Sequence, residues 1–143
     1  MIGLLAAGLL IQTVEPQLIL TGVGRWAVFA DAASITPDDG GVRMRALQVA
    51  EADFTVGGKA YWGGWSWWRF DCVARTADRL DFSAVAAGGA EGPATAETEP
   101  AFALSAGGDA DELAAVACSG TARETGAESV SAAVALGRAR LAD

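Results

Sequence analysis

The chain has 143 residues, of which 52% are hydrophobic, and its 18 Asp and Glu against 10 Lys and Arg give a formal net charge of −8. This length suits one domain with a core of its own. The negative charge repels phosphate groups, which makes nucleic acid and anionic membranes poor partners. The sequence has no His, which excludes His-based catalytic triads and removes the commonest zinc ligand.

An unbroken apolar run of ten residues, 2–11, stands near the start of the sequence. Such a run is too short to cross a bilayer and matches the hydrophobic region of a signal peptide. We therefore expect residues 1–12 to belong to a signal peptide and residues 13–23 to form an N-terminal extension, with a short edge strand within residues 13–24 as the alternative. A buried strand or helix is the alternative, because no Lys or Arg precedes the run. Export would place the protein in the periplasm or on the outer cell surface, without a stable membrane span.

Alternation of apolar and polar residues predicts strands over residues 26–30, 42–49 and 79–86. Val42, Met44 and Ala46 share one face of the second strand, and Arg43 and Arg45 share the other. In the third strand, the pattern predicts that Leu80, Phe82, Ala84 and Ala86 point inward and that Arg79, Asp81 and Ser83 point outward.

The longest alternating stretch, residues 65–74, organises the chain. Its even-numbered residues include Trp68, Phe70 and Cys72, and we expect this apolar set to face a core. Its odd-numbered residues mix large aromatic and charged side chains, and we expect their face to be partly wet.

Residues 88–100 are rich in Gly, Ala, Thr, Glu and Pro and are predicted to form a mobile loop. A helix is predicted to begin at Asp109, a favourable N-cap that is followed three residues later by Glu112. Its apolar side includes Cys118, and Gly120 is a plausible stop. Residues 121–143 carry only a thin apolar stripe and are predicted to be weakly helical, with disorder as the alternative.

The sequence has two cysteines, Cys72 and Cys118, which are 46 positions apart. No CxxC motif exists, which excludes a thioredoxin-like site and a four-cysteine metal site. Two interpretations remain. The cysteines are two buried thiols in a reducing cytosol, or one disulfide in an exported protein.

No catalytic constellation stands out. Ser34 and Ser66 have no His to activate them, and Lys59 is the only lysine. The acidic residues Glu97 and Glu99 fall in a loop without substrate-binding context, and helix capping explains the acids that begin at Asp109. We predict no catalytic residue, no metal and no cofactor, with an enzyme that uses Lys59 or the acidic loops as the alternative.

The strongest oddity is that four of the five Trp lie between residues 62 and 68. The functional hypothesis is an outward face that binds a protein, a glycan or a second copy of the chain. This hypothesis names Trp65, Trp67, Arg69 and Asp71. The alternative is that Trp65 and Trp67 are covered by the tail or by Phe54 and that the charged residues pair across strands.

Several of these features, taken in order, resemble a known family. They are Trp26, residues 31–35 with the Gly turn after them, the arginine-bearing strand, residues 70–72, and a last helix that ends near Cys118. Over residues 24–120 the order resembles the bacterial surface-adhesin protein E family, which contains many small exported proteins of unknown role. The resemblance implies an antiparallel sheet with a C-terminal helix tied to one face by a Cys72–Cys118 disulfide.

We therefore predict an α+β fold with an antiparallel sheet of about five or six strands and one disulfide-tethered helix. The expected function is that of an exported, non-catalytic cell-envelope protein that binds a macromolecular partner, adhesin-like by resemblance. The alternatives are a structural periplasmic subunit that dimerises through its sheet and an enzyme of unrecognised type.

Overall fold

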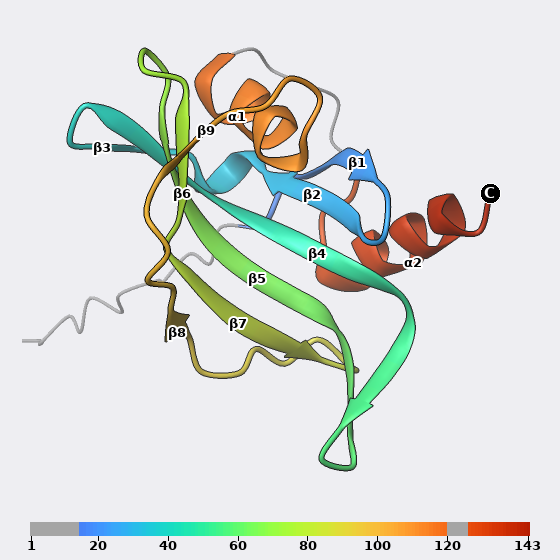
Figure 1. Cartoon of the computed structure of the whole chain (residues 1–143). Coiled ribbons are helices and arrows are strands. Elements are labelled where there is room, and N and C mark those ends of the chain that lie inside the picture. Colours follow the sequence, from blue (N-terminus) through green and yellow to red (C-terminus); the bar gives the residue numbers. More distant parts are fainter. Residues whose placement is uncertain (1–14, 120–125) are drawn as a thin grey trace, which may run out of the picture.

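The computed structural model describes residues 15–119 and 126–143, so the expected signal segment, residues 1–12, lies outside the described part. The described residues form one antiparallel sheet and two α-helices (Figure 1). The strands are β1 (Leu18–Val23), β2 (Ala27–Asp31), β3 (Thr36–Asp38), β4 (Gly41–Val56), β5 (Lys59–Asp71), β6 (Thr76–Arg79), β7 (Asp81–Ala86), β8 (Thr95–Ala96) and β9 (Phe102–Ala103). A 3-10 turn, η1 (Ala32–Ser34), follows β2, and the helices are α1 (Asp109–Ser119) and α2 (Val130–Leu141).

The long hairpin of β4 and β5 is the centre of the sheet. β2 and then β1 lie beside β4, and β3 pairs with the start of β4. On the other side, β5 pairs first with β7 and then with β6, and the short strands β8 and β9 extend these two. The antiparallel sheet with a tethered helix confirms the predicted fold. The described residues form nine strands, more than the five or six predicted, because segments expected to be turn or loop also pair with the sheet.

One face of the sheet, which we call the α1 face, is partly covered by α1. Even-numbered residues from 42 to 48 in β4 and from 64 to 70 in β5 point to this face, as alternation predicts. The buried residues of this core are Ile19, Val28, Ala30, Met44, Ala46, Phe70, Ala77, Leu113, Ala114, Val116 and Ala117. Burial of a residue such as Phe70 or Leu113 contributes about 1.5–3 kcal/mol, so the few large side chains dominate this largely alanine-rich contact.

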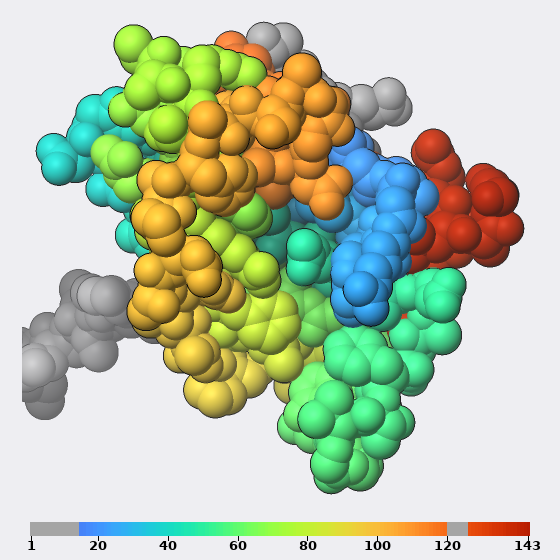
Figure 2. Space-filling model, viewed as in Figure 1, coloured from blue at the N-terminus to red at the C-terminus, as the bar shows by residue number. Residues whose placement is uncertain are grey.

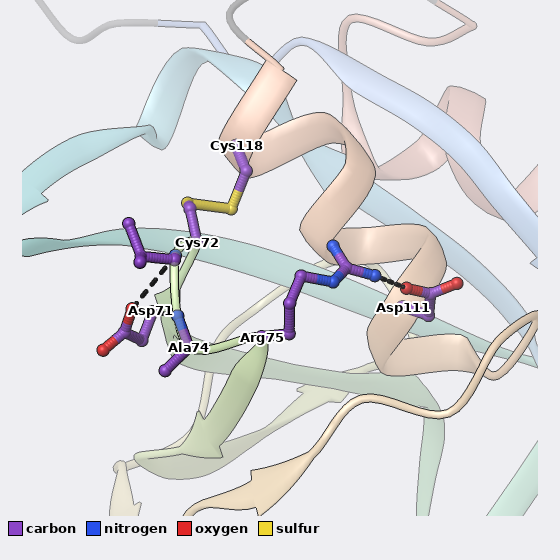
Figure 3. Close-up of a disulfide and its surroundings, with 7 residues drawn as sticks. Asp71, Cys72, Ala74, Arg75, Asp111 and Cys118 are labelled. Carbon is purple, nitrogen blue, oxygen red and sulfur yellow. Dashed lines mark hydrogen bonds and ion pairs between the residues drawn. A yellow bond between two sulfur atoms is a disulfide. The ribbon is translucent and has the colours of Figure 1, made fainter.

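The turn after β5 holds α1 at both of its ends (Figure 3). The disulfide between Cys72 and Cys118 joins this turn to the end of α1, with the two Cα atoms 5.7 Å apart. This bond confirms the pairing that the family resemblance implies. An Arg75 nitrogen lies 2.6 Å from a carboxylate oxygen of Asp111, in the first turn of the same helix. The helix is therefore fixed in position as well as attached.

The opposite face, the α2 face, is covered by α2, for which the sequence predicts only a weak helix or disorder. The helix begins at the N-cap Ser129, whose side chain accepts a hydrogen bond from the Ala132 N–H. A Cβ atom at Gly137 would lie 2.8 Å from the Cβ of Ala27, so the absence of a side chain lets the helix approach the sheet closely. The buried residues of this core are Leu18, Ala27, Phe29, Leu47, Val49, Trp65, Val85, Ala127, Ala133 and Val134.

The start of the domain and the orientation of β7 differ from the main sequence prediction. For residues 13–23, an N-terminal extension and a short edge strand are the two predicted alternatives, and Leu18–Val23 form the edge strand β1, in which Leu18 is fully buried. In β7 the inward and outward sets are partly reversed. Pairing places Ser83 opposite Trp65, so Ser83 and Val85 are buried on the α2 face. Phe82 points to the α1 face, where it remains partly exposed. Neither described helix is long and apolar enough to span a membrane.

Candidate ligand-binding face

The four residues predicted to bind a partner occupy alternate positions of β5, so they share the α2 face. Trp65 is only 3% exposed and belongs to the core beneath α2. Trp67 is partly exposed. The alternative that the tail covers Trp65 is therefore correct, because Trp65 packs with residues of α2.

Arginine side chains of β4 lie over these Trp rings. The Arg45 guanidinium is 4.0 Å from the centre of the Trp65 ring, and that of Arg43 is 5.0 Å from the centre of the Trp67 ring. Arg45 also pairs with Glu91 at 2.7 Å. Such cation–π contacts stabilise a structure without any ligand. Contacts within the chain therefore explain why arginine and tryptophan side chains gather on this face.

Arg69 and Asp71 hold the two turns that lie near the end of β5. Arg69 donates a hydrogen bond to the Asp39 carbonyl at 2.8 Å and lies 3.7 Å from the Asp38 carboxylate. The Asp71 carboxylate accepts from two N–H groups of the turn that follows β5 (Figure 3). A binding role for these four residues stays a prediction, and each described contact gives them a structural role.

A second group of aromatic residues lies on the α1 face, outside the area that α1 covers. Figure 2 shows this face hollowed between the orange segment of α1 and β9 and the green arm of β4 and β5. We call this region the open floor. Its residues are Gln48, Tyr61, Trp68, Arg79, Phe82 and Phe102.

Trp68 and Phe102 form an aromatic corner in a hollow of about 310 Å³. Their rings stand at 76°, with centres 6.3 Å apart, and Phe102 is 46% exposed. Trp68 also stacks on the fully buried Phe70, with ring centres 6.0 Å apart, so the ring is held by the core. The hollow is lined by Gln48, Trp68, Arg79, Phe102, Ser105, Gly108, Asp109, Ala110 and Asp111.

Small residues of β5 create the floor of this face. The Phe82 ring lies directly over Gly64, where a Cβ atom would come within 2.2 Å of it. Beside this ring, Arg79 donates from Nε to the Ser66 hydroxyl at 2.8 Å, and its guanidinium is 5.4 Å from the Phe82 ring centre. Because residues 64 and 66 are small, both larger side chains can lie across the strand.

A second hollow, of about 290 Å³, adjoins the first beyond the Arg79–Phe82 pair. Tyr61 lines it and stacks on Phe54, with ring centres 5.7 Å apart. Lys59, the only lysine, also lines this hollow, with its ammonium nitrogen 5.8 Å from the Tyr61 ring centre. The open floor therefore combines aromatic rings with both cationic and anionic groups, a lining suited to binding.

The other chemical candidates have structural partners. The Ser34 hydroxyl donates to the Asp31 carbonyl and accepts from the Arg45 N–H. Burial raises the pKa of the Asp31 carboxyl, which lines neither hollow described above and accepts from the Gln17 and Ala33 N–H groups. Within residues 15–119 and 126–143, no three His, Cys, Asp or Glu side chains are grouped as a metal site.

Sequence reasoning missed the open floor because it assigned Trp68 and Phe82 to a covered core. The feature of the sequence that could have indicated the open floor is the pair of small residues Gly64 and Ser66, which leave space beside large rings. No protein-family model matches the chain, and comparisons with curated proteins and with solved structures likewise find no match.

Proposed function

We propose that this chain is an exported, non-catalytic cell-envelope protein that binds a macromolecular partner through the open floor. One observation carries the proposal. Several aromatic rings, among them the 46%-exposed Phe102, line two adjoining hollows on a sheet face that α1 covers only in part. Exposed aromatic groups on a rigid sheet are typical of interaction sites, because they bury much apolar area at little entropic cost.

Export is supported by the Cys72–Cys118 disulfide, because such bonds persist mainly in oxidising compartments. The signal-like run at residues 2–11 points the same way. The resemblance to the surface-adhesin protein E family is part of this proposal and agrees with a helix joined to an antiparallel sheet.

Neighbouring Trp residues on opposite faces give a direct test. Ligands would be selected for the full chain from a random peptide library and from a glycan panel. We expect Trp68→Ala to weaken their binding at least about tenfold, the equivalent of 1.4 kcal/mol. We expect Trp67→Ala to leave binding unchanged, since Trp67 lies on the α2 face.

The opposite result would show that the binding site lies on the α2 face, as the sequence predicts. A selected ligand that loses affinity in Trp67→Ala but not in Trp68→Ala would contradict the open floor as the binding site. Val73→Ala serves as a general control, because Val73 is 93% exposed and lines neither hollow.

A further inference from the structure

The charges around the first hollow are paired except for one. Arg79 lies 4.0 Å from Glu97, and Asp111 lies 2.6 Å from Arg75. Asp109 also lines the hollow, but its carboxylate has no hydrogen bond or ion pair within the described part of the chain. Among the charged side chains of the hollow, the Asp109 carboxylate is therefore the one without a charged partner, although the N-terminus of α1 offsets part of its charge.

The surroundings keep the Asp109 carboxylate uncovered. Gly22 of β1 lies beside it, and a Cβ atom at Gly22 would lie 3.4 Å from the carboxylate oxygen Oδ1 of Asp109. Because Gly22 has no side chain, β1 places no group over the carboxylate. The Gln48 amide, which lines the same hollow, likewise has no side-chain hydrogen bond among the described residues.

Aromatic rings beside a free carboxylate favour a cation. The negative faces of the Trp68 and Phe102 rings attract an ammonium or guanidinium group, and a carboxylate adds a direct ion pair. The net charge of −8 raises the local concentration of cationic partners further. With about 310 Å³, the hollow is at the small end of the range for ligand sites, roughly 300–1,000 Å³. That size suits one side chain.

We propose that the hollow bounded by Trp68, Phe102 and Asp109 takes a basic side chain, Lys or Arg, of a peptide or protein partner. This inference rests on the proposed function and specifies the chemistry of its ligand. The stem of the basic side chain packs against the Trp68 and Phe102 rings, and its charged end meets the Asp109 carboxylate. The Gln48 amide is available to the backbone of the partner.

The test uses the full chain with its indole N–H groups observed by NMR. The probe is a blocked pentapeptide with one central Lys among Ala residues, and its matched partner carries Nε-acetyl-lysine instead. We expect the Lys peptide to shift the Trp68 indole signal saturably. The Trp65 signal, from the opposite face, should stay in place. We expect acetylation to weaken binding at least about fivefold, because it removes the charge.

Two variants separate the carboxylate from general charge effects. Asp109→Asn should weaken binding of the Lys peptide to a similar extent, whereas Glu128→Gln, which removes a charge at the start of α2, should not. Equal binding of the two peptides, or no saturable shift of Trp68, would overturn the inference. If ligands selected from the libraries still depend on Trp68 in that case, the proposed function stands without a basic partner. If they do not depend on Trp68, the proposed function itself is wrong.

Discussion

Neighbouring residues of one strand face have different environments, as Trp65 and Trp67 show. Trp65 lies beneath α2 and is 3% exposed, whereas Trp67 is partly open. We expect Trp65→Ala to reduce the free energy of unfolding by about 3–5 kcal/mol, because it leaves a cavity in the α2 core. Trp67→Ala should cost clearly less. Urea denaturation measures both values, and an equal small loss would contradict the burial of Trp65.

The carboxyl of Asp31 gives a prediction about pH. Burial raises its pKa above the ordinary value of 3.8, against the lowering effects of the Gln17 and Ala33 N–H groups and of the Arg45 charge. The folded state therefore holds the proton more tightly than the unfolded state. This contribution to stability is complete below pH 3.8 and is lost as the pH rises through the folded pKa.

Asp31→Asn removes this titration and keeps an oxygen that can accept the same N–H groups. We expect the stability of the variant relative to the wild type to rise as the pH increases above 3.8, because the wild type loses its contribution as the carboxyl ionises. Urea denaturation at several pH values provides the measurement. A relative stability that falls with increasing pH would show that the pKa is lowered instead.

At the scale of elements, α1 depends on its attachments. Its buried residues are Leu113, Ala114, Val116 and Ala117, so apolar burial contributes modestly, and an isolated helix of this length is marginal. The disulfide closes a loop with a sequence separation of 46, for which chain entropy predicts about 4 kcal/mol as an upper value. We expect Cys118→Ser to lower the melting temperature strongly.

Hydrogen exchange can locate the effect of Cys118→Ser. The amides of α1 should lose protection before those of β4 and β5, because the helix is released while the sheet remains paired. Since Asp109 lies on α1, ligand binding at the first hollow should weaken as well. Asp111→Asn, which weakens the partly exposed pair with Arg75 and leaves the disulfide intact, is the matched control for the protection of the α1 amides and should change it little. Uniform loss of protection over the whole sheet would contradict this order.

At the scale of the whole molecule, the covered α2 face limits where the chain could be cut during the proposed export. β1 supplies Leu18 to the α2 core, so the folded domain needs residues 18–23, and the proposed cleavage must leave them in place. We expect protein taken from its native host to lie outside the cytoplasm, to lack residues 1–12 and to have no free thiol. Mass spectrometry and thiol counting on denatured, unreduced protein test this. An intact Met1 with two thiols in a cytoplasmic fraction would refute export.

The sequence alone determined the main secondary structure of the core. Alternation in residues 42–49 correctly placed Met44 and Ala46 opposite Arg43 and Arg45, because successive side chains of a strand must point to opposite faces. The sequence also predicted correctly that α1 begins at Asp109, although the Asp109 side chain makes no capping hydrogen bond within the described part of the chain. The pairing of Cys72 with Cys118 followed from the resemblance and from the apolar faces that carry them, and the structure contains this bond.

Only the tertiary structure decided which parts of the two sheet faces are covered. Alternation separates the faces of a strand but does not say which face receives a helix, and here both do, each over part of its area. The weakly amphipathic residues 130–141 became a covering helix because Gly137 permits close approach and Arg138 pairs with Asp53 at 2.8 Å. That packing buries Trp65. The limited reach of α1 leaves Trp68 and Phe102 at the open floor, because burial depends on neighbours that are distant in sequence.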